Sequence, residues 1–270
     1  IEKAFLKDKL LFSLAIYYPL GYYKGPREDI DPLEENRQKQ VVALIRTQFL
    51  KRLESSAHAF ERSCQRLLLK FLTFMTKHCE TESEKHVLER WKYQHDELIE
   101  YIHNQQLELF GGEDEGEAEE DLISDEMLED VEYLSRDEYK VEEILQETIL
   151  DLDQIAEFLD ELKKFKPQHD DKLKALIRLL TKDQVLSQHK VIIFTEYSDT
   201  ATYLFKQLQE NSIEGLDKVD STDKRDRGDI LRRFAPYYND SSSAGLQENR
   251  EKEIRVLIST DVLSERAQPS

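Results

Sequence analysis

Glycine, proline and cysteine are scarce in this sequence of 270 residues, which contains 8 Gly, 6 Pro and 2 Cys. Few glycines and prolines mean few helix breakers, so the composition favours helix. Cys64 and Cys79 are too few for a disulfide scaffold and lie in a helical pattern, so we expect reduced, buried thiols. No run of about 18 apolar residues and no basic, apolar leader is present, so we expect a cytoplasmic protein without membrane contact.

Charged residues, by contrast, are abundant, with 57 acidic and 38 basic side chains and a net charge of −19. Residues 111–138 hold 14 of the carboxylates and one basic residue, Arg136, for a net charge of −13. Such a run repels itself and predicts a solvated loop, or, in a functional interpretation, an internal decoy that competes with DNA for a basic surface. The other 242 residues carry only −6, so the total charge does not exclude binding to nucleic acid.

Two stretches after a connector at 1–36 have the spacing of amphipathic helices. In residues 37–79 ten apolar residues recur at a mean interval of about 3.8 residues, which predicts one long helix. A second helical segment is expected at 82–110, where two glycines follow and end it.

A third helical stretch has the spacing of a coiled-coil seam, with apolar residues in alternating steps of four and three. These residues are Val141, Leu145, Thr148, Leu152, Ile155, Leu159 and Leu162. The helices can pack on one another, with the acidic loop as a connection between two of them. We therefore expect an all-α, coiled-coil-like protrusion at 37–166.

From residue 168 the pattern changes to alternating helices and short apolar runs. A helix at 170–183 precedes KVIIFT at 190–195, and this apolar run is typical of a parallel strand covered on both faces. Ser198 or Asp199 can cap the next helix. Further along we expect a weak strand at 216–220, a helix at about 222–234, a polar loop at 236–252 and a buried strand at 254–260. The alternation predicts an α/β fold with a parallel sheet, helices on both faces, and a ligand edge at the strand carboxyl ends.

Three motifs in this part of the chain follow the order of a known helicase lobe: KVIIFTEYSDTATYL (190–204), TDKRDRGDILRRFAP (222–236) and IRVLISTDVLSE (254–265). The chain resembles the second RecA-like lobe of Swi/Snf-type superfamily-two helicase-like ATPases. The closest resemblance is to the bacterial branch that includes RNA-polymerase-recycling and phage-defence translocases. KVIIFTEYSDT resembles motif four of the family, and VLISTDVLSE resembles motif five. RTQFLKRLESSAHAF (46–60) is similar to a segment between the two lobes.

The resemblance implies an incomplete second RecA-like lobe at 168–270, in a parent protein that binds ATP and Mg²⁺ and moves along duplex DNA. Motifs four and five grip the DNA backbone in this family, which implies phosphate contacts from Thr195, Ser198 and Thr260. Hydroxyl and backbone N–H groups at strand ends suit phosphate oxygens, because they fix position without reading bases. Asp261 and Glu265 are implied to couple the DNA grip to the nucleotide cleft. The alternative is that Ser198 only caps a helix and that the two threonines only end strands.

A basic stretch at 37–70, with a net charge of +6, is a second candidate DNA surface. Its side chains can equally be the solvated face of a helix. The similarity of RTQFLKRLESS to the family segment favours a functional surface that docks at the lobe–lobe cleft. The candidate residues are Arg46, Lys51, Arg52, Arg62 and Arg66.

The departures from the family pattern are as informative as the matches. The sequence contains no GxxxxGK[ST] loop and no DExH or DExD segment after an apolar strand, so the first RecA-like lobe is absent and would be a partner within the parent. Arg266-Ala267-Gln268 stands where the family has Gly and an apolar turn, and no motif six follows up to Ser270. We expect that this chain alone has no catalytic residues and does not hydrolyse ATP. The rival hypothesis is a non-enzymatic module, whose helical protrusion and acidic loop bind a protein partner.

Two sets of side chains could be metal ligands, but packing explains them better. His95-Asp96 and His169-Asp170 resemble the pairs of a metal phosphohydrolase, but the second pair follows Pro167 in a linker. The set Cys64, His78, Cys79 and His86 lacks a CxxC hook, and Cys64 continues an apolar stripe. We therefore expect no metal site.

Overall fold

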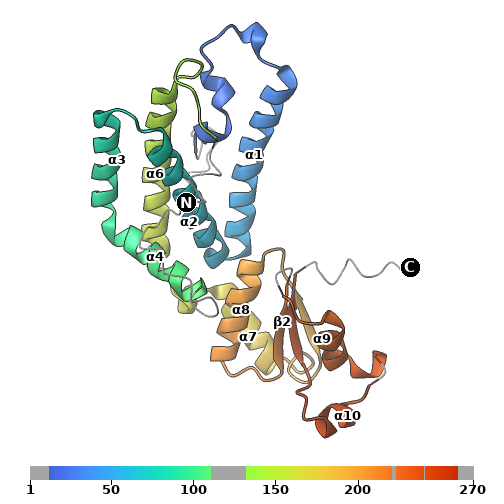
Figure 1. Cartoon of the computed structure of the whole chain (residues 1–270). Helices are drawn as coiled ribbons and strands as arrows, with labels where there is room; N and C mark the ends of the chain where they lie inside the picture. The colour runs from blue at the N-terminus through green and yellow to red at the C-terminus, as the bar shows by residue number, and fades with distance from the viewer. Residues whose placement is uncertain (1–11, 111–131, 221–222, 240, 261–270) are drawn as a thin grey trace. The chain divides into compact units, whose positions relative to one another are not determined.

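The computed structural model describes residues 12–110, 132–220, 223–239 and 241–260, which fold as two units (Figure 1). The first unit comprises Ile1–Lys51 and Glu61–Lys164, and the second comprises Arg52–Phe60 and Phe165–Ser270. The second unit therefore includes the end of the helix Pro32–Ser55 and the start of the helix Ala57–His78. Among the helices of the described residues, none is both long and apolar enough to cross a bilayer.

The first unit consists of helices and short 3₁₀ turns. α2 is its central helix, because Cys64, Leu68, Phe71 and Met75 are buried in it together with most of the residues between them. The helices are α1 (Pro32–Ser55), α2 (Ala57–His78), α3 (Glu82–Gln94), α4 (Asp96–Phe110) and α6 (Val141–Leu162), and the 3₁₀ turns are Ala15–Tyr17, Pro19–Tyr22 and Arg27–Asp29.

α6 buries every residue of the predicted seam. It also buries Ile144, Asp151, Ala156 and Phe158, so its buried stripe is wider than the seam alone. The indole N–H of Trp91 in α3 donates to Asp153 of α6 at 2.8 Å, which fixes one helix against the other. Trp91 packs within the bundle, since only 3% of its surface is exposed.

The prediction of one long helix at 37–79 is wrong, because the chain bends at Ser56 between α1 and α2. The Ser56 hydroxyl accepts the N–H of Ala59 at 3.0 Å, which is the hydrogen bond of a helix N-cap. The break takes only one residue, so the apolar spacing continues across it and conceals it in the sequence. The segment predicted at 82–110 is likewise two helices, α3 and α4, which meet at His95.

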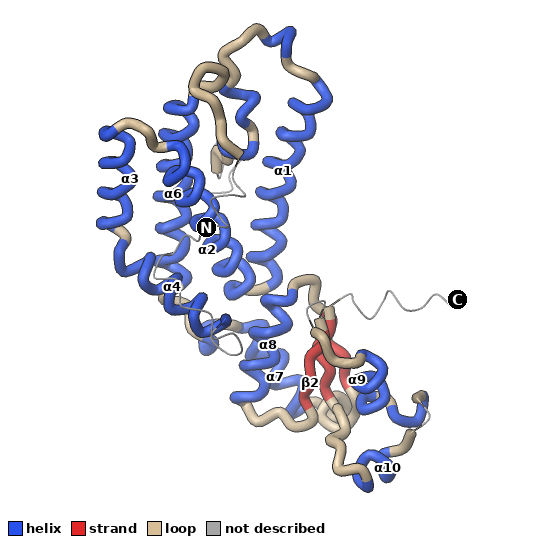
Figure 2. Tube along the Cα trace, viewed as in Figure 1, coloured by secondary structure: helices blue, strands red, loops and turns tan. Residues whose placement is uncertain are grey.

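The second unit is an α/β layer built on a three-stranded parallel sheet (Figure 2). The strands are β1 (Val191–Phe194), β2 (Leu216–Val219) and β3 (Val256–Ser259), in the order β1-β3-β2. Phe194, Ser259 and Val219 occupy the same level of the sheet. The predicted α/β class and the parallel strands are confirmed. The helices of this unit are α7 (Asp171–Lys182), α8 (Ser198–Glu210), α9 (Arg227–Phe234) and α10 (Ser243–Glu248), and the 3₁₀ turns are Pro167–His169 and Pro236–Tyr238.

Helices cover both faces of this sheet. Leu180 of α7 and Leu208 of α8 pack with Val256 and Ile258 on one face. On the other face, apolar residues of α9 pack against Leu257 and Val219. These two clusters position the ends of the three strands.

Three local predictions in this unit are wrong. β1 is not covered on both faces, because Ile192 and Phe194 are 41% and 64% exposed beside the cluster that α9 forms with β2 and β3. The helix expected at 222–234 begins only at Arg227, since the Asp226 carboxylate accepts the N–H of Gly228 and starts the helix there. The polar loop at 236–252 contains α10.

Candidate functional site

The carboxyl ends of the three strands meet at one edge of the sheet, which we call the carboxyl edge. Thr195, Thr260 and Asp220 directly follow β1, β3 and β2. The Thr195 N–H donates to the Ser259 carbonyl at 3.0 Å, and the Thr260 N–H donates to the Val219 carbonyl at 3.3 Å. The fold therefore brings together two of the residues that the sequence predicted as phosphate contacts.

The hydroxyl of Thr260 is buried at this edge without a hydrogen-bond partner. The residue is 4% exposed, and within the described part of the chain its Oγ1 atom has neither donor nor acceptor. The neighbouring Ser259 hydroxyl, in contrast, donates to the Thr260 carbonyl at 2.6 Å. A buried hydroxyl with no partner costs about 1–3 kcal/mol, so the unpaired state of Thr260 calls for an explanation.

The N-terminus of α8 lies directly after Thr195. Ser198 is the first helical residue, and its N-cap, Tyr197, makes no side-chain hydrogen bond to the helix. The prediction that Ser198 or Asp199 caps this helix is therefore wrong, because Tyr197 is the residue with extended backbone angles, φ −116° and ψ 130°. A helix N-terminus of this kind attracts anions through its N–H groups and its dipole.

A lysine that the sequence analysis missed lies close to this edge. The Lys218 ammonium is 2.7 Å from the Asp220 carboxylate and donates to the Thr202 hydroxyl of α8 at 3.0 Å. The Asp220 side chain is 1% exposed, so the ammonium neutralises a buried charge. One lysine within a weak strand carries no sequence signal for such a role.

The end of α1 and the start of α2, residues 52–60, contact the first turn of α8 within the second unit. The Arg52 guanidinium forms an ion pair with Asp199 at 2.9 Å and lies 4.6 Å from the ring centroid of Tyr197. The Thr200 hydroxyl is 2.9 Å from the Ser55 hydroxyl and 3.0 Å from that of Ser56. We call Arg52–Phe60 the elbow segment.

The other residues of the predicted basic surface have different surroundings. Arg46 donates from Nε to the Phe12 carbonyl at 3.2 Å and so serves the fold of the first unit. Arg62 donates to the Gln65 side chain at 3.1 Å. Lys51 and Arg66 are exposed.

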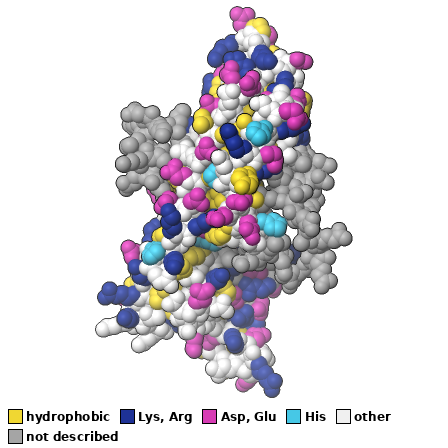
Figure 3. Space-filling view, turned by 90° about the vertical axis from the view of Figure 1, so that its left-hand side faces the viewer, with side chains coloured by type: hydrophobic (Ala, Val, Ile, Leu, Met, Phe, Trp, Pro, Cys, Tyr) yellow, Lys and Arg dark blue, Asp and Glu magenta, His cyan; other side chains and the backbone are white. Residues whose placement is uncertain are grey.

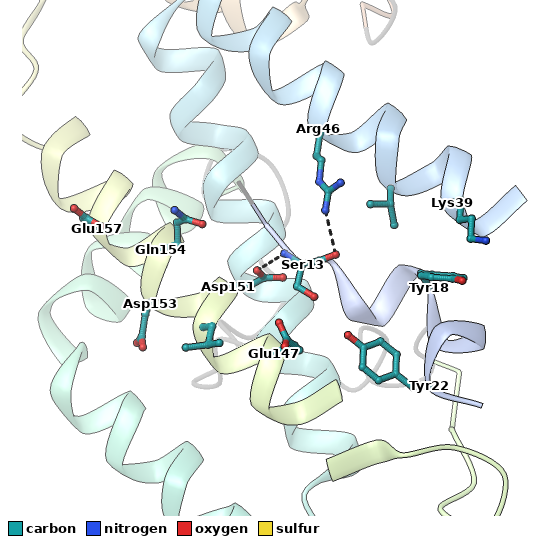
Figure 4. A pocket seen from close by; sticks show the side chains of 12 residues that line it. Ser13, Tyr18, Tyr22, Lys39, Arg46, Glu147, Asp151, Asp153, Gln154 and Glu157 are labelled. Carbon is teal, nitrogen blue, oxygen red and sulfur yellow. Dashed lines mark hydrogen bonds between the residues drawn. The ribbon is translucent and has the colours of Figure 1, made fainter. Parts of the chain in front are cut away.

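An open cleft of about 790 Å³ lies in the first unit between α1 and α6 (Figure 4). The Asp151 carboxylate accepts the N–H groups of Ser13 and Leu14 at 2.7 Å each, and burial raises its pKa to about 6. The charged groups at the back of the cleft therefore hold residues 12–14 in place. The cleft is lined by Ser13, Tyr18, Tyr22, Lys39, Val42, Arg46, Glu147, Leu150, Asp151, Asp153, Gln154 and Glu157.

Two predicted site residues, Asp261 and Glu265, lie outside the described residues. The turn from β1 to α8, Thr195-Glu196-Tyr197, contains no glycine of the kind that lets a backbone wrap a nucleotide triphosphate, and we assign no ATP or Mg²⁺ ligand to it.

The metal alternatives gain no support from the side-chain geometry. Over the ranges that the structure describes, no group of three or more His, Cys, Asp and Glu side chains is arranged to hold a metal ion. Cys64 and Cys79 are free and buried, as predicted, and burial raises the pKa of both thiols.

Neither surface charge nor similarity to known proteins identifies the ligand. On the face shown in Figure 3, basic and acidic side chains of the described residues are interspersed. Comparison with protein-family models, curated proteins and solved structures found no match to this chain.

Proposed function

We propose that this chain supplies the second lobe of a Swi/Snf-type DNA-dependent ATPase, and that its carboxyl edge holds backbone phosphates of duplex DNA. One observation carries the proposal. Thr195, the α8 N-terminus at Ser198 and the unpartnered Thr260 hydroxyl meet at this edge, which is the edge that the resemblance to motifs four and five implies. ATP, Mg²⁺ and the first RecA-like lobe belong to the parent, and the chain alone does not hydrolyse ATP.

The chemistry of the edge suits a phosphate better than a base. It presents hydroxyls, backbone N–H groups and, close by, the Lys218 ammonium, all of which hydrogen-bond phosphate oxygens. None of these groups matches the paired donor and acceptor pattern by which proteins read base edges. We therefore expect binding that is independent of DNA sequence and that weakens with salt.

A charge introduced at Ser198 tests the proposal. Ser198→Glu places a carboxylate in the first turn of α8, where the helix dipole favours it by about 0.3–1 kcal/mol, so the fold is retained. The same carboxylate repels a phosphate at the edge. Gln209→Glu adds the same charge at the exposed far end of α8 and is the matched control.

Binding is measured by fluorescence anisotropy with a short labelled duplex at low ionic strength. We expect Ser198→Glu to raise Kd about tenfold, which is about 1.4 kcal/mol, and Gln209→Glu to change it less than twofold. Equal effects of the two substitutions, or no binding by the unsubstituted chain, would count against the proposal.

The open cleft between α1 and α6 favours the second candidate, a protein-interaction module. Leu150 on α6 is 62% exposed at this cleft and gives its lining an apolar contact for a partner. Leu150→Glu should then disable the parent protein in cells, whereas Ser198→Glu should leave it active. The reverse pattern supports the DNA-binding function.

A further inference from the structure

The elbow segment is fastened to the start of α8 by four contacts. Arg52 pairs with Asp199 and stacks on Tyr197, and the Ser55 and Ser56 hydroxyls meet the hydroxyl of Thr200. Two further contacts lie beside them. The His58 ring stacks on Tyr203 with centroids 5.5 Å apart, and the Lys172 ammonium donates to the Glu54 carbonyl.

The contact made by Arg52 is the one that reaches the phosphate edge itself. Asp199 is the second residue of α8, directly after Ser198, and its side chain is 16% exposed. A carboxylate there suits the helix dipole but repels a phosphate that approaches the same N–H groups. Arg52, with 26% of its side chain exposed, neutralises the carboxylate and draws it toward the elbow segment.

Arg52 also restrains the residue before the helix. Its guanidinium lies over the ring of Tyr197, which is 8% exposed and is the N-cap of α8. A planar guanidinium can stack on a ring and hydrogen-bond a carboxylate at the same time, which an ammonium cannot do. One side chain thus holds the residues on both sides of Ser198.

We infer that Arg52 is a positioning residue for the carboxyl edge: it neutralises Asp199 and fixes Tyr197, so that Ser198 and the first N–H groups of α8 face an incoming phosphate. The inference rests on the function proposed above. It differs from the prediction that Arg52 is itself a phosphate ligand on a basic surface, because here the guanidinium stays on Asp199 when DNA binds.

The two roles predict different salt dependence for Arg52→Ala. Loss of a phosphate ligand lowers the slope of log K against log salt by about 0.9. Loss of a positioning residue weakens binding about tenfold, the size expected for one charge-assisted hydrogen bond, and leaves the slope unchanged. Arg90→Ala, which removes an exposed charge from α3, is the matched control and should change Kd less than twofold.

A double-mutant cycle with Asp199→Asn separates the roles further. If Arg52 neutralises Asp199, the substitution Asp199→Asn changes DNA binding little in the unsubstituted chain but recovers most of the loss in the Arg52→Ala background. If Arg52 is a phosphate ligand, Asp199→Asn tightens binding mainly in the unsubstituted chain, since it releases the guanidinium. The second pattern overturns the inference.

Amide hydrogen exchange in the absence of DNA tests the positioning role of Arg52 separately from DNA binding. Arg52→Ala should speed exchange of the Ala201 N–H, which donates to the Tyr197 carbonyl at 3.0 Å, at least tenfold. Arg52→Lys should give a smaller increase because it keeps the charge without the stacking plane. Unchanged exchange in both variants refutes the positioning role, whatever the DNA result. Faster exchange in a chain that does not bind duplex DNA supports the positioning role and refutes the proposed function.

Discussion

The substitution Thr260→Val separates the stability of the fold from its proposed function, because we expect it to change the two in opposite directions. Valine has nearly the shape of threonine, so packing at the end of β3 is conserved. The buried Oγ1 atom has no partner in the part of the chain that the structure describes. Removing it therefore relieves the penalty of about 1–3 kcal/mol for an unsatisfied buried hydroxyl, and the second unit should become more stable.

Binding to DNA should weaken in the same variant. A hydroxyl that donates to a charged phosphate contributes about 1.5–3 kcal/mol, which corresponds to a rise in Kd of about ten- to a hundredfold. Urea unfolding gives the first quantity, and fluorescence anisotropy with a short duplex gives the second.

Thr200→Val is the matched control for this experiment. Thr200 is also buried, but its hydroxyl meets those of Ser55 and Ser56, so its loss should destabilise the unit by about 1–3 kcal/mol. If Thr260→Val destabilises the chain as much as the control does, the Thr260 hydroxyl has a structural partner and the reasoning fails. An unchanged Kd in a stabilised Thr260→Val chain removes this hydroxyl from the phosphate site.

Two further predictions concern pH. Burial raises the pKa of Asp151 from its ordinary 3.8 to about 6, so the folded state holds the proton more tightly than the unfolded chain and stability falls as pH rises between these values. Urea unfolding at pH 4 and pH 7 should show Asp151→Asn gaining about 2 kcal/mol relative to the unsubstituted chain between these two pH values, and a constant difference would contradict this. Burial lowers the pKa of His78, whose Nδ1–H donates to the Phe74 carbonyl while Nε2 accepts the Leu134 N–H at 3.0 Å. The contribution of the neutral ring to the free energy of unfolding should therefore be lost as pH falls below about 6.5. If the His78→Asn variant loses as much stability on acidification as the unsubstituted chain does, the prediction is wrong.

The sequence predicted the elements that rest on local apolar spacing. The runs at 190–195 and 254–260 contain β1 and β3, and the seam residues of α6 are all buried. The break at Ser56 was missed because it depends on one hydroxyl that caps α2, and a one-residue interruption leaves the apolar spacing intact.

The candidate site was predictable only where a residue type at a strand end carries meaning. The parallel pattern predicted that Thr195 and Thr260 lie at one edge, since the ends of neighbouring parallel strands share an edge. Their role as phosphate contacts was implied only by the family resemblance. The pair formed by Arg52 and Asp199 joins residues 147 positions apart, and no local pattern foretells it. The unpartnered state of the Thr260 hydroxyl is likewise a property of packing rather than of spacing.

Titration of the isotope-labelled chain with duplex DNA, followed through its backbone amide resonances, shows whether the carboxyl edge binds DNA phosphates. We expect the largest shifts at Thr195, at Ser198 to Thr200 and at Thr260. They should be the same for duplexes of different sequence and be lost when the duplex phosphates are replaced by uncharged methylphosphonates. Shifts confined to α1 or α6, or none at the carboxyl edge, would contradict the proposed function.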